Sequence, residues 1–361
     1  MIRATFVMEQ HIGHRAYYQN LRKFIDVEPN LIATWVPVTY SDSGSFWSHW
    51  SFLTQNVKGT LIGRGQVRSG LRRAPADILL FNTQVPAALA GKLVKQQPYL
   101  LCVDITPMQY DQMAAQYGHK SDNEGLLSRY KHWVNVNLLQ NAACVLPWST
   151  WVRDSLVADY GVPLEQIEVI APGVDLEIWR PCKHANDGPL RILFVGGDYY
   201  RKGGDVLYEA FQRLPYGSAE LHLVTRAQVK PETHIHVYNH MKPNSPELIE
   251  LYQAADVFVL PSKAEAFGIA AVEASAVGLP IIATAVGGLT DTVVADNTGF
   301  LVRPGDATEL SERLYQLATQ PELRQKLGQA SRQRAEQRFD ARRNAARVVD
   351  ILQKIAIRKV R

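Results

Sequence analysis

Short apolar segments alternate with amphipathic ones along this chain, and the alternation runs through it twice. In the first half, strands are expected at residues 3–8, 31–37, 77–82, 99–104, 144–147 and 168–170. Helices are expected at residues 15–23, 129–141 and 150–159. Strands that alternate with helices in this way predict a parallel sheet with helices on both faces.

A polar, proline-containing segment at residues 181–189 is expected to be a linker, and the alternation restarts after it. The second set of strands is expected at residues 191–195, 220–225, 257–260, 280–284 and 300–302. Helices are expected at residues 205–213 and 246–255, after Gly268, and over almost all of the chain beyond Pro321. Asp306 and Glu309 have the spacing of a capping box, which marks the start of another helix.

Length and alternation together predict two domains, because 361 residues exceed the size of one typical core. We expect an α/β fold with Rossmann-like parallel-sheet domains at residues 1–182 and 183–340, followed by a basic helix at residues 341–361. Ligands of open parallel sheets bind at the carboxyl ends of the strands. With two such domains, a cleft between them is the expected binding site.

The composition, 46% hydrophobic and 20% charged, is typical of a globular protein. No apolar run approaches the ~20 residues that a membrane-spanning helix needs. The N-terminus soon reaches the acidic Glu9, so a signal peptide is not expected. The cysteines, Cys102, Cys144 and Cys182, are odd in number and widely spaced, and they suit neither a disulfide framework nor a zinc site. We therefore expect a reducing, cytoplasmic compartment.

Positive charge is concentrated in two segments. Residues 341–361 hold seven basic residues and one acidic residue, which gives 7 − 1 = +6 against +4 for the whole chain. The second run, Lys58 to Arg73, is interrupted by Gly63, Gly65 and Gly70, which argue against a stable helix. A solvated face is one interpretation of these runs, and an anionic membrane surface is the other. Nucleic acid is not expected as a partner, because no binding motif for it is present.

The segment between residues 261 and 280 carries two informative carboxylates. Glu265 is expected in a loop, and Glu273 in a short helix that begins near Gly268 and ends at Gly278. The apolar stripe of that helix consists of Ile269, Val272 and Ala276, and Glu273 occupies the position that would complete it. A carboxylate that faces the interior needs a partner, either a protein cation or the hydroxyl groups of a ligand.

This segment resembles the Glu-x7-Glu signature of the retaining glycosyltransferases of family 4, which have the GT-B fold. The resemblance implies that Glu265 contacts the hydroxyls of a donor hexose and that Glu273 contacts the ribose of its nucleotide. It also implies that the backbone amides of Phe267, Gly268 and Ile269 approach the phosphates, and amides at the start of a helix do attract anions. As in relatives, the basic C-terminal helix is expected to cross back to the N-terminal domain.

A second motif, residues 194–204, links an expected strand to a helix and contains Lys202 within a Lys-Gly pair. Taken alone it is a glycine-containing turn with two cations, without a dinucleotide or Walker pattern. It is similar to the family segment whose lysine binds the donor diphosphate, with Gly196 as the glycine at the strand end. The family often has an arginine after that glycine, where this chain has Gly197, and Arg201 is the candidate second cation. The resemblance covers residues 144–340.

Two N-terminal positions are further candidates. Gly13 lies where the family has a glycine loop near the diphosphate and the acceptor, and a plain turn is the alternative. Asp104, at an expected strand end, stands in a region where many members carry a histidine that contacts the hexose. Asp104 and Thr106 could bind sugar hydroxyls, and Asp104 could orient or deprotonate the acceptor. The alternative for both is a turn or helix cap before Pro107.

The implied function is metal-independent transfer of a hexose, with retention, from a nucleoside-diphosphate sugar to a hydroxyl of a lipid or saccharide. Asp104, Lys202 and Glu265 are the expected catalytic residues, and no cofactor or metal is expected. A cytoplasmic enzyme follows, free or attached to the inner face of a membrane. The alternatives are a non-catalytic nucleotide-sugar scaffold and a GT-B epimerase or phosphorylase. An oxidoreductase is disfavoured because the dinucleotide fingerprint is absent.

Overall fold

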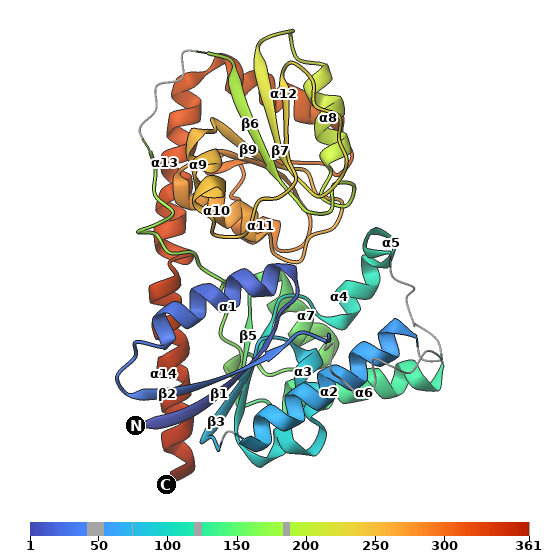
Figure 1. Ribbon diagram of the computed structural model, residues 1–361, viewed down its shortest axis with the longest axis vertical. Coiled ribbons are helices and arrows are strands. Elements are labelled where there is room, and N and C mark those ends of the chain that lie inside the picture. The colour runs from blue at the N-terminus through green and yellow to red at the C-terminus, as the bar shows by residue number, and fades with distance from the viewer. Residues whose placement is uncertain (42–53, 74, 119–124, 183–187, 361) are drawn as a thin grey trace. The chain divides into compact units, whose positions relative to one another are not determined.

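The computed structural model describes residues 1–41, 54–73, 75–118, 125–182 and 188–360 (Figure 1). The chain divides into two compact units, each with its own parallel sheet. Unit 1 comprises Met1–Asp111, Ser121–Ala171 and Ala341–Arg361, and unit 2 comprises Gln112–Lys120 and Pro172–Asp340. The expected fold class, α/β with two Rossmann-like domains, is confirmed, whereas the expected cleft between them stays a prediction.

The sheet of unit 1 has the strand order β2-β1-β3-β4-β5, and every neighbouring pair is parallel. Its strands are β1 (Ile2–Glu9), β2 (Leu31–Val38), β3 (Ile78–Phe81), β4 (Tyr99–Val103) and β5 (Cys144–Pro147). All four residues of β3 and all five of β4 are buried, as expected for strands covered by helices on both sides. The order places the topological switch point beside β1, because β2 lies on one side of it and β3 on the other.

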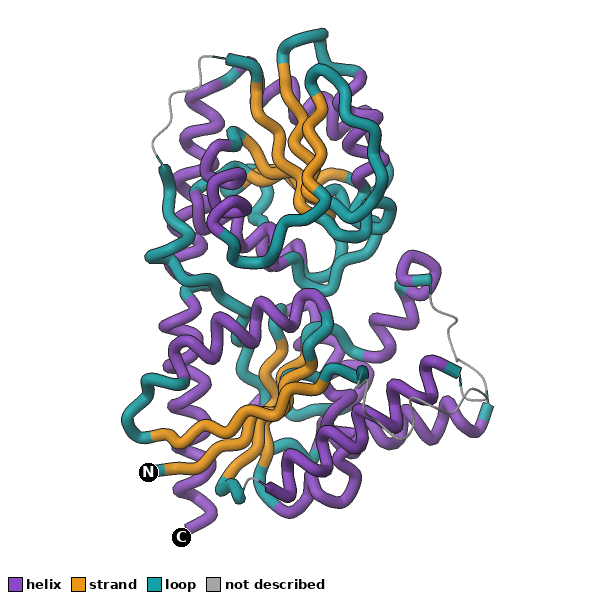
Figure 2. The backbone as a smooth tube through the Cα atoms, viewed as in Figure 1, coloured by secondary structure: helices purple, strands orange, loops and turns teal. Residues whose placement is uncertain are grey.

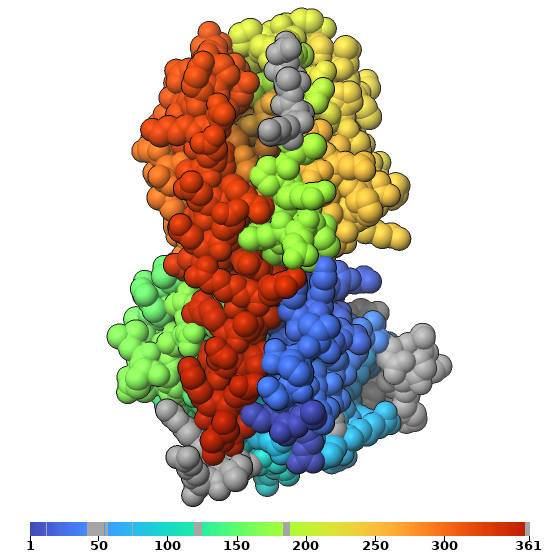
Figure 3. All heavy atoms as spheres, turned by 90° about the vertical axis from the view of Figure 1, so that its left-hand side faces the viewer, coloured from blue at the N-terminus to red at the C-terminus, as the bar shows by residue number. Residues whose placement is uncertain are grey.

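The helices of unit 1 are α1 (Ile12–Ile25), α2 (Gln55–Arg73), α3 (Gln84–Ala90), η2 (Gly91–Gln96), α4 (Pro107–Gln112), α6 (Leu126–Gln140), α7 (Thr150–Tyr160), η3 (Leu164–Gln166) and α14 (Ala341–Val360). Helix α14 packs beside α1 although the two lie more than 300 residues apart in the sequence (Figure 3). A buried Asn344 on α14 donates a hydrogen bond of 2.9 Å to the carbonyl of Ala171. The C-terminal helix is therefore part of the structure of unit 1.

Two expectations for unit 1 are wrong. Residues 168–170 are not a strand: the amides of Glu168 and Ile170 donate to β5, but only Ile167 forms a bridge, which is too little for a ladder. The glycine-containing run after Lys58 does form a helix, α2. Glycine is needed at two positions of this helix because side chains of other elements approach its backbone closely. A Cβ on Gly70 would lie 2.3 Å from Val36, and one on Gly63 would lie 2.5 Å from Tyr40. Close packing outweighs the low helix propensity of glycine at these positions.

The sheet of unit 2 has the strand order β11-β10-β9-β6-β7-β8, again parallel throughout. Its strands are β6 (Leu190–Val195), β7 (Ala219–Val224), β8 (Ile235–Tyr238), β9 (Val257–Leu260), β10 (Ile281–Thr284) and β11 (Gly299–Val302). The switch point lies at β6, between β9 and β7. Loops that follow β6 and β9 are therefore the place where a ligand of this unit is expected.

The helices of unit 2 are α5 (Ala114–Tyr117), α8 (Gly204–Gln212), α9 (Pro246–Ala254), α10 (Ile269–Val277), α11 (Leu289–Thr292), α12 (Ala307–Thr319) and α13 (Pro321–Arg338), and helices cover both faces of the sheet (Figure 2). Asp306 caps α12, since its side chain accepts from the amide of Glu309 at 2.9 Å. The Glu309 carboxylate accepts from the amide of Arg303 instead of returning to Asp306, so the expected capping box is only half formed. Of the expected linker, residues 183–187 lie outside the described part of the chain.

Candidate functional site

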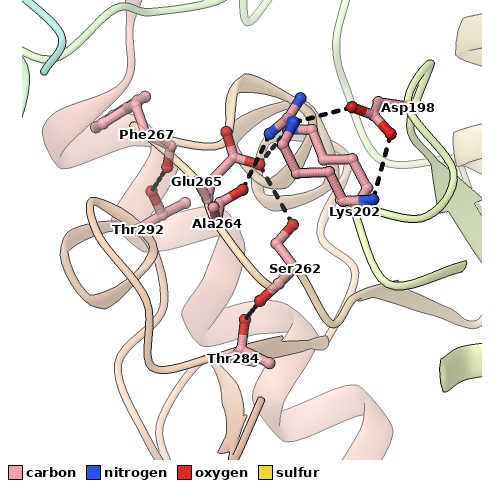
Figure 4. A network of polar contacts seen from close by, with 9 residues as sticks. Asp198, Lys202, Ser262, Ala264, Glu265, Phe267, Thr284 and Thr292 are labelled. Atoms are coloured by element: carbon pink, nitrogen blue, oxygen red, sulfur yellow. Dashed lines mark hydrogen bonds and ion pairs between the residues drawn. The ribbon is translucent and has the colours of Figure 1, made fainter. Parts of the chain in front are cut away.

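Two loops of unit 2 meet at the switch point and bring opposite charges together. Lys202 belongs to the loop after β6, and Glu265 to the loop after β9. The Lys202 ammonium donates to Oε2 of Glu265, and the two side chains are only 16% and 8% exposed (Figure 4). The structure thus places side by side a cation and a carboxylate that are 63 residues apart in the sequence.

A set of hydroxyl groups holds the Glu265 loop in place (Figure 4). Ser262 donates to the Glu265 carboxylate at 3.4 Å, and Thr284 at the end of β10 donates to the Ser262 carbonyl at 2.6 Å. Thr292 on α11 donates to the Phe267 carbonyl at 3.3 Å. The three hydroxyl residues are fully buried, so the loop is fixed from beneath. These three residues could not be identified from the sequence, because a supporting hydroxyl has no fixed spacing from the residue that it supports.

Glycines let a second backbone segment approach the Glu265 loop closely. Gly287 has φ = +53°, and a Cβ there would lie 1.9 Å from the carbonyl oxygen of Glu265. Gly268, the residue before α10, has φ = +93°, a conformation that only glycine adopts readily. Both positions keep the backbone near Glu265 free of side chains, which favours close approach by a ligand.

Arg201 lies beside Lys202 and is held by several partners. Its guanidinium donates to Asp198 at 3.1 Å and to the carbonyl of Ala264 at 3.0 Å, and it lies 4.7 Å from the ring centroid of Tyr117. Gly196 directly follows β6, and a Cβ there would lie 3.0 Å from the Cβ of Lys202. The strand-end glycine therefore gives the lysine side chain room to approach the sheet.

Glu273 lies on α10, one turn after the helix begins at Ile269, and its side chain points into the interior. Gly268 and Gly278 lie at the two helix ends as expected, but the helix is buried on all sides from Ala271 to Val277 instead of along one apolar stripe. Among the described residues, the hydrogen-bond partner of Glu273 is the Tyr252 hydroxyl, which donates to Oε2 at 2.8 Å. Burial raises the pKa of Glu273 to about 7, and the tyrosine bond offsets only part of that rise.

The sequence left two kinds of partner open for Glu273, and the Tyr252 contact distinguishes between them. Tyr252 is itself fully buried, and the Trp179 ring lies 5.2 Å away, edge to face. A neutral phenol cannot neutralise a carboxylate, so the observed partner is not the protein cation that one alternative required. The other alternative, a ligand with hydroxyl groups, remains.

Polar residues in unit 1 also gather at strand ends beside the switch point. Glu9 ends β1, and its backbone amide donates to Oδ1 of the Asn82 side chain at 2.7 Å. The Thr83 hydroxyl donates to the Glu9 carboxylate at 2.6 Å. Gly13 is the second residue of α1, and it is exposed. The sequence analysis missed Glu9, Asn82 and Thr83, because the loops after β1 and β3 share no motif.

Asp104 directly follows β4 and forms an ion pair with His14 on α1, with 3.3 Å between Oδ2 and Nε2. Burial disfavours the charged imidazole, but the Asp104 carboxylate outweighs it, so the pKa of His14 is raised. The His14 ring lies 5.2 Å from that of Trp148. Thr106 is fully buried, and its hydroxyl accepts from the Gln109 amide at 3.2 Å, which supports the helix-cap alternative for this residue.

Comparison with known proteins agrees with this geometry. Residues 176–334 match the family described as "Glycosyl transferases group 1", and residues 33–178 match "Glycosyltransferase Family 4". A D-inositol 3-phosphate glycosyltransferase of Kribbella flavida is 33% identical over 209 residues, which are 50% of this chain and 49% of the relative. A glycogen synthase of Mycobacterium tuberculosis is 28% identical over 62% of this chain and 56% of the relative. The chain thus spans about half the length of the curated relatives it matches.

Solved structures match over nearly the whole chain. Sucrose-phosphate synthase of Thermosynechococcus elongatus aligns with a TM-score of 0.80 at 18% identity, over 98% of this chain and 99% of that one. Anabaena HepE, solved in complex with UDP-glucose, aligns with a TM-score of 0.71 at 16% identity, over 98% and 100%. At such identities the structural similarity establishes the fold alone. The two family matches adjoin and together span residues 33–334, and they are the evidence for common ancestry. The chain belongs to the group 1, family 4 glycosyltransferases.

Proposed function

We propose that this protein transfers a hexose, with retention, from a nucleoside-diphosphate sugar to a hydroxyl group of a lipid or saccharide. Unit 2 binds the donor, and unit 1 supplies the acceptor side. The observation that carries the proposal is the meeting of Lys202 and Glu265 beside the N-terminus of α10. The cation suits the diphosphate of such a donor, and the carboxylate suits its sugar hydroxyls. The helix N-terminus suits the phosphate at which the diphosphate and the sugar join.

The donor diphosphate is assigned to Lys202, Arg201 and the first amides of α10. Lys202 pairs with Glu265 in the structure, and a diphosphate offers it a second, more negative partner. Arg201 lies next to it in the same loop, and Gly268 leaves the helix start unobstructed. These fixed positive groups compensate the phosphate charge, so the proposed reaction needs no divalent metal at this position.

The two carboxylates are assigned to the two sugars of the donor. Glu265 accepts from the hexose hydroxyls, and its position is fixed by Ser262 and the buried hydroxyls beneath. Glu273 accepts from the ribose hydroxyls, which supply the hydrogen bonds that a buried carboxylate needs. Phe267 and Ile269 lie between the two carboxylates and contribute backbone amides toward the phosphates.

Transfer breaks the bond between the anomeric carbon and the diphosphate oxygen, so negative charge develops on the leaving group. Lys202 and Arg201 stabilise that charge, and removal of one such preorganised donor typically costs about 2.7–4 kcal/mol of barrier. The acceptor attacks from the face that the diphosphate leaves, which gives retention, and a phosphate oxygen takes the acceptor proton. Asp104 orients the acceptor, with its own position fixed by His14.

Two surface features of unit 1 favour an acceptor presented at an anionic membrane. The start of α6 exposes four large side chains: Leu126 at 84%, Leu127 at 63%, and Tyr130 and Trp133 at 60% each. Helix α2 carries five basic residues, Lys58, Arg64, Arg68, Arg72 and Arg73. Exposed apolar and aromatic side chains are typical of segments that lie on a membrane surface, and so are basic helices. No helix in the described part of the chain has the length and hydrophobicity to cross a bilayer.

Thermal unfolding with UDP, GDP and ADP tests the donor site. A diphosphate at about 100 times its dissociation constant stabilises the folded state by ~2.7 kcal/mol, which is a clear shift in melting temperature. We expect one of the three to shift the wild type and to lose that shift in Glu273→Ala. Glu250→Gln, on the exposed side of α9, is the control and should behave as the wild type.

The outcomes separate the proposed transferase from its alternatives. If no diphosphate shifts the wild type, the assignment of unit 2 as the donor site is wrong. If a diphosphate binds but no hexose reaches any acceptor, and Glu265→Ala changes nothing, the protein is a nucleotide-sugar scaffold. A nucleotide sugar whose hexose has changed configuration at one carbon would identify an epimerase. Release of the hexose as a sugar phosphate would identify a phosphorylase.

A further inference from the structure

Three side chains that can bind a metal meet on the sheet of unit 2, away from the loops that hold Glu265 and Lys202. Glu220 and His222 lie on β7, and His236 lies on the neighbouring edge strand β8 (β7 is labelled in Figure 1). One ligand atom from each residue lies within 4.8 Å of the other two. The proposed transfer reaction uses none of the three residues.

The parallel register explains why these side chains converge. Glu220 and His222 are two residues apart on one strand and therefore share a face of the sheet. His222 pairs directly with His236 in the register, and their rings stack with 4.7 Å between centroids. All three residues are half-buried, so the cluster can be reached from solvent.

His222 carries the most informative detail of the cluster. Its Nε2 is buried, and among the described residues it has no hydrogen-bond partner. Oε2 of Glu220 is 3.8 Å away from it, beyond hydrogen-bond distance. The other ring nitrogen, Nδ1, lies 3.1 Å from the Tyr238 hydroxyl. A buried imidazole nitrogen without a partner calls for a physical explanation.

The Tyr238 contact suits a metal-binding histidine. When Nδ1–H donates to the Tyr238 oxygen, the lone pair lies on Nε2, the ring nitrogen that is left to bind a metal. Histidines that bind metals usually donate their second ring N–H to such an outer partner, which fixes the tautomer. Burial, and then the nearby His236, lower the pKa of His222, which favours the neutral imidazole that a metal requires.

We propose that Glu220, His222 and His236 bind one Zn²⁺ ion, with water as the fourth ligand. Two imidazoles and one carboxylate form a ligand set that Zn²⁺ accepts in tetrahedral geometry. Zinc ligands lie about 2.0–2.2 Å from the ion, so two of them are at most about 4.4 Å apart. The observed 4.8 Å limit is close to this value, and the stacked rings of His222 and His236 must rotate about their side-chain bonds so that both lone pairs meet at the ion.

A positive charge beside the cluster restricts which metal ions the cluster can bind. Arg191 on β6 pairs in register with Glu220 and lies near His222, where it also contributes to the lowered pKa. Its guanidinium donates to the carbonyl of Ala254 at 3.5 Å, at the end of α9. A cation beside a single carboxylate disfavours Mg²⁺ and Ca²⁺, which need several oxygen ligands. Imidazole ligands favour Zn²⁺, so selectivity for zinc over magnesium follows from the ligand set.

A bound ion would connect the edge strand β8 to the neighbouring strand β7. β8 has only four residues, and β7 is its sole neighbour in the sheet order. An ion held by His236 on one strand and by Glu220 and His222 on the other joins the two strands independently of their backbone bonds. Bound zinc should therefore raise the melting temperature of the protein, because the unfolded chain does not hold the three ligands together.

The test is calorimetric titration of the full chain, without an affinity tag, after removal of metals by a chelator. We expect one Zn²⁺ per chain, a higher melting temperature with zinc, and no binding of Mg²⁺. His236→Gln and Glu220→Gln should each weaken zinc binding at least tenfold. The matched control is His234→Gln, because the His234 ring lies against Tyr216, 5.1 Å away, and outside the cluster. Co²⁺, used as an optical probe, should give the strong visible absorption of a tetrahedral site.

Each outcome decides for or against the zinc site. Loss of binding in His236→Gln with the fold intact, and retention in His234→Gln, supports it. Zinc binding of equal strength in His236→Gln, Glu220→Gln and the wild type overturns it, as does absence of binding to the wild type. These results do not depend on the transferase proposal, since zinc affinity is measured without donor or acceptor.

Discussion

Replacing Glu273 by Gln should stabilise the protein at alkaline pH. The carboxyl is buried, and its pKa is raised from the usual 4.5 to about 7 in the folded protein. Between these two values the folded state keeps a proton that the unfolded state has lost, so stability falls as the pH rises. The favourable contribution is fully present below pH 4.5 and is lost once the pH exceeds about 7.

The size of the effect follows from the same two values. Each pH unit between them is worth about 1.4 kcal/mol. From pH 5 to pH 8 the wild type crosses about two such units, so it should lose about 3 kcal/mol from this group alone. A glutamine keeps an acceptor for the Tyr252 hydroxyl and does not titrate, so Glu273→Gln should not show this loss.

Melting temperatures at pH 5 and pH 8 measure the difference. For a domain of the size of unit 2, 1 kcal/mol corresponds to about 2–4 °C, so the wild type should lose about 6–12 °C more than Glu273→Gln. The exposed Glu250→Gln is the control and should follow the wild type. An equal pH dependence in the wild type and Glu273→Gln would refute the reasoning, because the buried carboxyl would then not titrate as its surroundings require.

Three other changes have defined outcomes. Lys202→Ala should lower the turnover rate about 100- to 1,000-fold in a transfer assay, whereas Lys263→Ala, which removes only a partly exposed pair with Asp205, should change it little. Thr284→Val removes a buried hydrogen bond and should cost about 1–3 kcal/mol in denaturant unfolding, and unchanged stability would contradict this. Asp104→Asn should lower the pKa of the neighbouring histidine, because the carboxylate that raises it is gone, and an unchanged NMR titration would exclude the pairing.

The fold was predictable from the sequence where burial leaves a continuous apolar run. Strands such as β3 and β9 are buried throughout and were found, with ends within one or two residues. β8 was missed because it is a short edge strand in which only Ile235 is buried and the three residues after it are half-buried. α2 was judged unstable from its glycines, and packing against Tyr40 and Val36, which propensity does not describe, decides that helix.

The candidate site was predictable only where a motif spans a short stretch of chain. Lys202 and Glu265 were identified one by one from their local patterns, but their ion pair depends on the order of strands in the sheet. The partner of Glu273 was missed for a similar reason: Tyr252 lies in the expected helix at residues 246–255, and nothing in the sequence pairs it with a carboxylate. The His222–His236 pair depends on strand register, which a missed edge strand cannot reveal.

The most direct test of the central claim is release of nucleoside diphosphate from a panel of nucleotide sugars. The wild type, Lys202→Ala and Glu265→Gln would be compared with a mixture of saccharide and lipid acceptors. We predict release from at least one nucleotide sugar, with hexose appearing on an acceptor, and a loss of about 100-fold or more in both variants. Equal rates in all three proteins, or no release from a nucleotide sugar that demonstrably binds, would contradict the assignment of these residues to hexosyl transfer.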